Sequence, residues 1–230
     1  MKDLAQGEGS TLAALLLACW FALLHRYCGQ QDLICGLPSL GREDSRFLST
    51  VGYFVNMLPI RMQVDPAMSF RDLLRGVARK LRDALGHSAF PFARLLEHLG
   101  IARDLQRTPV YQTSLAFENL PAQELLPLLF DPDGRPPMSY KGISVRAISL
   151  EQQVGQTDLG CMCSEITGSV VGRIDYCTEL FDKPTIDRLC EHFLQLIRGA
   201  CDQPDTAIGR LPLLSEKERQ QMLSEWNQTE

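Results

Sequence analysis

Asn56 is a polar residue between two mainly apolar runs in the stretch Val51–Met62, whose sequence is VGYFVNMLPIRM. A buried amide is costly unless its donors and acceptor are hydrogen-bonded. Two interpretations are open. Either Asn56 caps a chain reversal before Pro59, as asparagines in turns commonly do, or its amide points into a site and bonds a substrate or a reacting group. The alternation on either side predicts two strands joined by a pivot at this asparagine.

No motif in the chain would support catalysis on its own, since G-x-S-x-G, a P-loop and H-E-x-x-H are all absent. The four histidines are scattered and have no visible nucleophile or carboxylate partner in the sequence. The eight cysteines include no C-x-x-C pair, so we expect no metal site. A chain of 230 residues needs no disulfides, and we expect reduced, mostly buried thiols.

Composition excludes two classes of partner. The net charge is −5 with both signs interspersed, which leaves no basic face for nucleic acid. The apolar run Leu12–Leu24 is too short to span a bilayer, which takes about 20 residues. It lacks the basic start of a signal peptide, and its helical spacing behind Ser10 or Thr11 predicts a buried core helix. We therefore expect a cytoplasmic protein with no membrane contact.

The remaining pattern predicts a mixed α/β domain with helices packed on one sheet. A proline-rich excursion, 120–140, is typical of a long surface loop, and Thr167-Gly168 of a tight hairpin turn. The tail carries a capping box, Ser215 and Glu218, followed by a charged helix. Further helices are expected at 69–87, 90–100 and 185–202, and strands at 32–38, 58–64, 111–119, 143–150, 158–166 and 169–177.

Four segments in register resemble the C-terminal half of the condensation domain of nonribosomal peptide synthetases. Gly41–Met62 is similar to that family's G-R…(I/V)-G-x-F-V-N-x-x-x-x-R motif, and His87–Leu99 to its H-x-x-x-P-F-x-x-(L/I)-(L/V)-x-x-L motif. Arg103–Asn119 and Gly172–Ile197 resemble two later motifs. The tail resembles the linker to an adenylation domain, so the resemblance divides the chain into a lobe, 1–210, and a linker, 211–230.

The resemblance implies a chloramphenicol acetyltransferase-like α/β sandwich that forms one lobe of a two-lobed domain. The active site would lie in the channel between this lobe and an N-terminal condensation lobe. Donor and acceptor carrier proteins would bring their thioesters on phosphopantetheine arms, and an amine would attack the thioester carbonyl. A downstream adenylation domain is the remaining implied partner. No other cofactor is implied.

The resemblance also implies roles for particular residues. Asn56 would face the channel, and Tyr53 and Asp158 are further substrate-binding candidates. Arg61 would bond carboxylates across the lobe interface, unless it is a solvated charge on an alternating strand. Arg42 lies near a loop where the acceptor carrier protein would dock.

One departure from the family leaves the enzymatic status of this chain open. The family's H-H-x-x-x-D-G motif is absent, since the chain contains no His-His pair, and no complete catalytic set remains. The chain is therefore either half of an amide-forming acyltransferase, inactive alone, or a non-catalytic carrier-docking or scaffold module. The equivalent lobe of a heterocyclisation domain is a further alternative.

Overall fold

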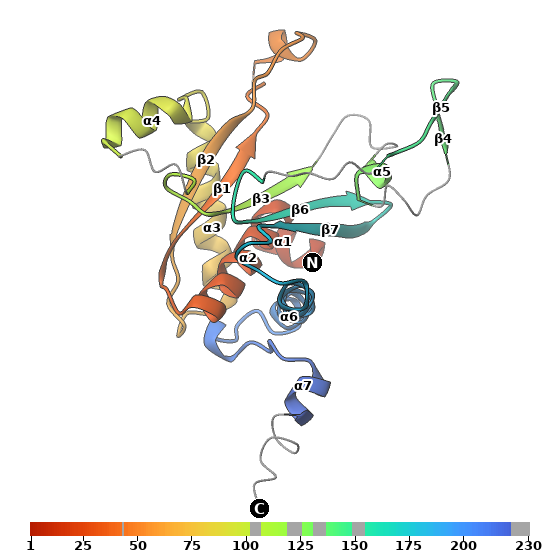
Figure 1. Cartoon of the computed structure of the whole chain (residues 1–230). Coiled ribbons are helices and arrows are strands. Elements are labelled where there is room, and N and C mark those ends of the chain that lie inside the picture. Colours follow the sequence, from red (N-terminus) through yellow and green to blue (C-terminus); the bar gives the residue numbers. More distant parts are fainter. Residues whose placement is uncertain (43, 102–106, 119–125, 131–136, 149–154, 222–230) are drawn as a thin grey trace, which may run out of the picture.

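The computed structural model describes residues 1–42, 44–101, 107–118, 126–130, 137–148 and 155–221 (Figure 1). The helices are α1 (Lys2–Gly7), α2 (Leu12–Cys28), α3 (Phe70–Gly86), α4 (Phe92–Leu99), α5 (Leu126–Phe130), α6 (Lys183–Asp202) and α7 (Glu216–Gln220), with 3-10 turns η1 (Ser45–Phe47) and η3 (Ile208–Arg210). The strands are β1 (Asp32–Ser39), β2 (Asn56–Gln63), β3 (Thr113–Glu118), β4 (Met138–Tyr140), β5 (Ile143–Val145), β6 (Leu159–Ile166) and β7 (Ser169–Tyr176). Within these ranges no helix is both long and apolar enough to cross a bilayer.

Five strands form one mixed sheet in the order β2-β1-β3-β6-β7. β1 and β2 pair antiparallel, and so do β6 and β7. β3 lies between the two pairs and runs parallel to both β1 and β6. The predicted hairpin is confirmed: Thr167 and Gly168 both have positive φ, 50° and 83°, as a two-residue turn with the twist of its strands requires.

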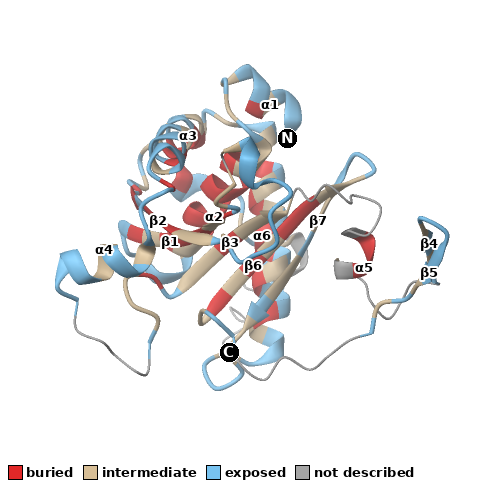
Figure 2. Ribbon diagram, turned by 90° about the horizontal axis from the view of Figure 1, so that it is seen from above, coloured by how far each residue is buried: buried red, intermediate tan, exposed pale blue. Residues whose placement is uncertain are grey.

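The helices α2, α3 and α6 cover one face of this sheet, with α2 in the middle (Figure 2). Because α2 lies between the sheet and two helices, it is buried on nearly every side, which explains the apolar run of its sequence. The indole N–H of Trp20 donates to Thr113 Oγ1 on β3 at 3.0 Å and so satisfies the buried donor. The predicted core helix is confirmed.

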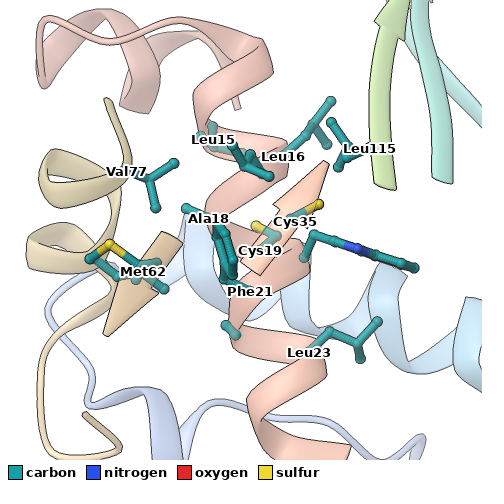
Figure 3. Close-up of a cluster of buried hydrophobic side chains, with 14 of the residues drawn as sticks. Leu15, Leu16, Ala18, Cys19, Phe21, Leu23, Cys35, Met62, Val77 and Leu115 are labelled. Atoms are coloured by element: carbon teal, nitrogen blue, oxygen red, sulfur yellow. The ribbon is translucent and has the colours of Figure 1, made fainter. Parts of the chain in front are cut away.

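The hydrophobic core is assembled from side chains that are far apart in sequence (Figure 3). Leu16 and Phe21 of α2 pack with Cys35 of β1, Val77 of α3 and Leu115 of β3, and all five are fully buried. All eight cysteines are free thiols, four of them buried. Burial raises the pKa of the Cys35 thiol, so that thiol stays protonated and behaves as a small apolar group.

The predicted helix starts are confirmed by their caps. Thr11 Oγ1 accepts the N–H of Ala14, and Ser69 accepts the N–H of Asp72. Both are hydroxyl residues at the N-cap, where a side-chain oxygen satisfies an orphan backbone donor. The helix α4 ends before Gly100, the last residue of the expected helix 90–100, and Gly100 adopts φ 63°, the left-handed conformation common at helix C-termini.

The predicted pivot before Pro59 is wrong. β2 begins at Asn56 and continues through Pro59 to Gln63, and residues 51–55 are not a strand. The N–H of Val64 bonds to Gln31 O at 2.7 Å, and alternate residues of a strand point their N–H groups to opposite sides. The nitrogen of Pro59 therefore points away from β1, to the free edge of the sheet, where a proline sacrifices no ladder bond. Asn56 thus does not cap a chain reversal.

Two other predictions are corrected. The expected strand 143–150 is only β5, which pairs with β4 in a separate two-stranded sheet. Lys141 and Gly142, with φ 49° and 81°, turn the chain back locally, so the alternating segment finds its partner within a few residues. The expected loop 120–140 contains α5 and β4; its segments 120–125 and 131–136, and residues 149–150 of the expected strand, lie outside the described residues.

Candidate functional site

The sheet face opposite α2 carries half-buried residues that alternate with the core residues of each strand. We call it the open face and define it by Ile34, Pro38, Ser114, Gly160 and Met162. It is a mixed surface of small, apolar and hydroxyl side chains.

Asn56 holds the segment between α3 and α4. Its Nδ2 donates to the carbonyl oxygens of Ser88 at 2.9 Å and Phe90 at 2.8 Å, and its Oδ1 accepts the N–H of Phe92 at 2.9 Å. Both amide hydrogens and one acceptor position are therefore used within the chain. Asn56 alternates with Leu58 and Ile60 along β2, so it shares the side of the sheet that the helices cover.

Tyr111 also contacts the start of α4, and its ring lies on the open face. Its ring covers Gly36 so closely that a Cβ at Gly36 would lie 2.4 Å from Tyr111 Cε2. The ring also meets Phe92, with centroids 5.5 Å apart. Burial raises the pKa of Tyr111 to about 12, so the phenol keeps its proton at neutral pH. Asn56 and Tyr111 together attach α4 to the sheet.

Two hydroxyls meet where β3 and β6 begin. Ser114 Oγ and Thr157 Oγ1 are 3.1 Å apart, and both lie close to Gly160, whose missing side chain leaves room for them. Asp158 follows Thr157 directly and is half-buried, and its carbonyl accepts the N–H of Cys177 at 2.9 Å. A substrate-binding role for Asp158 stays a prediction.

Arg42 is engaged within the loop that connects β1 and β2. Its guanidinium lies 4.3 Å from the ring centroid of Phe54 and donates to the carbonyls of Thr50 at 2.8 Å, Gly52 at 3.1 Å and Phe47. These contacts give the loop its shape, and contact with a carrier protein stays a prediction. Tyr53 projects from the same loop and is 85% exposed, so its side chain is available to a partner.

Arg61 forms a two-pronged ion pair with Asp32 on the neighbouring strand. Nε donates to Oδ1 at 2.8 Å and a terminal nitrogen donates to Oδ2 at 2.5 Å. The hydrogen bonds from Arg61 lower the pKa of Asp32. Both side chains are exposed, so the pair contributes little to stability. The carboxylate partner found here is within the chain, and a partner across a lobe interface stays a prediction.

The histidines supply no proton-transfer group to the open face within the described residues. His25 and His87 each bond a backbone carbonyl next to the end of their own helix, and His98 lies exposed in the last turn of α4. His192 belongs to the network described next. The described residues of the open face offer hydroxyl groups and no activated nucleophile or base.

A partly buried polar network fixes the C-terminal tail, and only one part of it was predictable. Glu218 and Ser215 form the expected capping box, with Glu218 Oε2 accepting the Ser215 N–H at 2.9 Å. Glu218 also meets His192 Nε2 at 3.1 Å, and His192 Nδ1 lies 2.7 Å from the Tyr27 hydroxyl. We call these four residues the tail clasp. Tyr27 and His192 are 165 positions apart, so no local signal could have joined them.

Comparison with known proteins identifies the family. Residues 1–223 match the condensation domain family. The chain is 33% identical over 227 residues to tyrocidine synthase 3 of Brevibacillus parabrevis, and 31% identical over 230 residues to bacitracin synthase 1 of Bacillus licheniformis. The two alignments cover 99% and 100% of this chain, but it spans only 3% and 4% of the length of these relatives.

Comparison with solved structures supports the same family. The chain superimposes with a TM-score of 0.85, at 25% identity, on a four-domain nonribosomal peptide synthetase bound to AMP and glycine, covering 94% of this chain and 17% of that one. The first condensation domain of the CDA synthetase gives a TM-score of 0.71 at 21% identity, over 93% of this chain and 44% of that one. The expected chloramphenicol acetyltransferase-like α/β fold is confirmed. This chain therefore belongs to the condensation-domain family of nonribosomal peptide synthetases.

Proposed function

We propose that this chain is the C-terminal lobe of a condensation domain that forms amide bonds between carrier-bound thioesters. The observation that carries the proposal is the coverage: 93% of the chain matches only 44% of a condensation domain, which leaves room for one more lobe of similar size. Residues 1–210 would form the lobe, and 211–230 would begin the linker toward an adenylation domain. The tail clasp, which holds the start of that linker, is consistent with this division.

In this reaction an amine on the acceptor carrier protein attacks the thioester carbonyl on the donor carrier protein. The C–N bond forms, the C–S bond breaks, and the proton lost by the amine ends on the released phosphopantetheine thiol. Both reactants are tethered, so much of the barrier is removed by proximity and orientation. The open face and the loop that carries Tyr53 would form one wall of the channel, and the acyl groups would pass along it.

The base or positioning histidine of this reaction would come from the N-terminal lobe, because this sequence has no H-H-x-x-x-D-G motif. Asn56 would act as a positioning residue, since its amide already holds residues 88–92 at the junction. Asp158 would contact substrate at the start of β6, Arg61 would meet carboxylates across the lobe interface, and Arg42 would shape the carrier-docking loop. The partners would be an N-terminal lobe, two carrier proteins and an adenylation domain, in the cytoplasm.

A second candidate is a non-catalytic carrier-docking or scaffold module, and the missing His-His pair favours it for the chain on its own. The equivalent lobe of a heterocyclisation domain has the same requirement for a second lobe. The scaffold module predicts no product and the heterocyclisation lobe a cyclised one, whereas the first proposal predicts an amide. A reconstitution experiment separates them.

The experiment adds a separately expressed N-terminal condensation lobe from a related synthetase to this chain, with donor and acceptor carrier proteins loaded. We expect no amide product from the chain alone and product, detected by mass spectrometry, when both lobes are present. Amide product from the chain alone, or none from the reconstituted pair, would contradict the proposal. A cyclised product would indicate heterocyclisation.

Asn56→Ala is compared with wild type in the same assay. We expect a rate lower by about tenfold or more, since residues 88–92 would lose all three of their bonds to the amide. Arg94→Ala, on the exposed face of α4, is the control and should leave the rate unchanged. If Asn56→Ala folds and reacts at the wild-type rate, Asn56 has a structural role only.

A further inference from the structure

A hollow of about 370 Å³ lies between the edge strand β2 and the helix α3, away from the junction at Asn56. It is formed by a small group of residues from these two elements: Arg61, Met62, Gln63, Gly76, Arg79 and Lys80. Its volume is in the range of sites that hold small organic molecules. Apart from Arg61, none of these residues has a role in the condensation reaction proposed above.

Gly76 opens this hollow. Gly76, Arg79 and Lys80 are spaced at i, i+3 and i+4 and therefore share one face of α3. A Cβ at Gly76 would lie 2.7 Å from Met62 Cε, so any larger residue would displace the methionine side chain that forms the apolar floor. The floor is soft and apolar, and the rim above it is cationic.

The charge on this rim is not neutralised. Arg71 and Arg75, earlier on the same helix, both bond Glu8, and Arg71 also bonds Asp205. Arg79 and Lys80, by contrast, have no hydrogen-bond or ion-pair partner among the residues that the structure describes. None of the described residues that line the hollow is a carboxylate, and Arg61 has its charge paired with Asp32. Two free cations thus meet at one concave place in a chain whose net charge is −5.

The backbone of β2 adds donors at the same place. Because the N–H of Val64 points to β1, the N–H groups of Gln63 and Arg61 alternate with it and fall on the free edge. Both residues line the hollow. Edge N–H groups beside a guanidinium and an ammonium are the donor set that binds oxyanions in proteins.

We propose that this hollow binds a small organic phosphate, with its phosphate groups on Arg79, Lys80 and the edge N–H groups and its organic part on Met62 and Gly76. Guanidinium and ammonium donors favour phosphate oxygens, and the apolar floor accounts for the preference for an organic body over a bare ion. The site goes beyond the proposed function and does not depend on it.

The test is isothermal titration calorimetry of the whole chain at low salt with ADP, pyrophosphate and inorganic phosphate as probes. We expect ADP to bind more tightly than pyrophosphate, and pyrophosphate more tightly than phosphate, with affinity falling as salt rises. The double variant R79Q/K80Q should bind ADP at least about tenfold more weakly. Gly76→Leu should reduce the advantage of ADP over pyrophosphate, because its side chain occupies the space above Met62.

The matched control is R82Q/R198Q, which removes the same charge from exposed positions on α3 and α6 outside the hollow. It should bind ADP as the wild type does. An equal loss in both double variants would mean non-specific attraction and would overturn the proposal. So would the absence of ADP binding by the wild type, or equal affinity for ADP and pyrophosphate. Circular dichroism confirms that each variant is folded.

Discussion

The amide of Asn56 is fully committed as a donor, which constrains what it can do at a catalytic site. Both of its hydrogens go to carbonyls of Ser88 and Phe90, so it cannot donate to a substrate without breaking one of these bonds. Each such bond contributes about 1 kcal/mol net, and an orphaned buried carbonyl costs more. Any role of Asn56 in catalysis would therefore be indirect, because Asn56 would act by fixing the position of residues 88–92. Only the second lone pair of Oδ1 remains for direct contact.

Gly36 is a second residue whose identity is set by its contact, here with the ring of Tyr111. We predict that Gly36→Ala lowers the free energy of unfolding by about 1–3 kcal/mol, because overpacking must move Tyr111 and with it Phe92. Urea denaturation measures the change. Gly86→Ala is the matched control, since a Cβ there meets nothing within 4 Å and φ is not positive; it should be neutral or slightly stabilising. Similar losses in both variants would contradict this account.

The sequence indicated Asn56 as a residue of interest but not its partners. The three groups that it bonds lie 32 to 36 positions later, across the whole of α3. A pattern of neighbours along the chain carries no information about such a contact. The same holds for Tyr111, whose position over Gly36 depends on the parallel pairing of β1 with β3. The sequence therefore identified the residues of interest, but their contacts in three dimensions could not be predicted from it.

At the scale of elements, the long helices were predictable because amphipathic spacing and caps act locally. Ser69 and Thr11 start α3 and α2 where expected, and Gly100 ends α4. The strand predictions failed where pairing with a neighbouring strand determines whether a segment forms a strand. Residues 51–55 alternate like a strand but pair with no strand among the described residues. Pro59, usually a strand breaker, is tolerated because its nitrogen faces the free edge of β2.

The tail clasp makes the attachment of the C-terminal segment depend on pH. Burial alone would raise the pKa of Glu218, but hydrogen bonds from the backbone and side chain of Ser215 and from His192 outweigh burial and lower it. A carboxyl whose folded pKa lies below its unfolded value, about 4.3, stabilises the fold above that pH and loses the contribution as pH falls through the folded value. The Tyr27 hydroxyl lies within hydrogen-bond distance of His192, and Arg188 acts on Tyr27.

We therefore predict that acidification below about pH 4 loosens residues 211–220 before the core. Hydrogen exchange measures this as loss of amide protection in the tail while α2 stays protected. Glu218→Gln should lower tail protection at neutral pH and flatten its pH dependence. Glu191→Gln, an exposed carboxyl on α6, is the control and should behave as the wild type. An unchanged pH profile in Glu218→Gln would show that the clasp does not hold the tail.

At the scale of the molecule, large apolar side chains are exposed on two projections that Figure 1 shows extending from the body, the loop after β1 and the β4–β5 hairpin. Val51 is fully exposed and Ile143 is 67% exposed. On the loop after β1, Leu48 and Tyr53 are exposed beside Val51, and a group of neighbouring exposed apolar side chains is typical of a surface that a partner covers. The match of nearly the whole chain to less than half of a condensation domain fits this picture.

We predict that the isolated chain self-associates as its concentration rises, because these side chains would contact one another between molecules when the proposed second lobe does not cover them. Light scattering over a concentration series measures the apparent mass. The double variant V51S/I143S should shift association to higher concentration, whereas Leu194→Ser, which removes an exposed leucine from α6, should not. A strictly monomeric wild type at high concentration would contradict the prediction.

The order of the sheet has a consequence for the speed of folding. β1 with β2 and β6 with β7 are local antiparallel pairs that form from nearby segments, but each pair reaches the other only through β3, whose parallel contacts close long stretches of chain. We predict that closing these loops limits the folding rate and that the contacts of Leu115, which is fully buried on β3, form after that step. Truncating Leu115 should then mainly accelerate unfolding, with little change in the refolding rate.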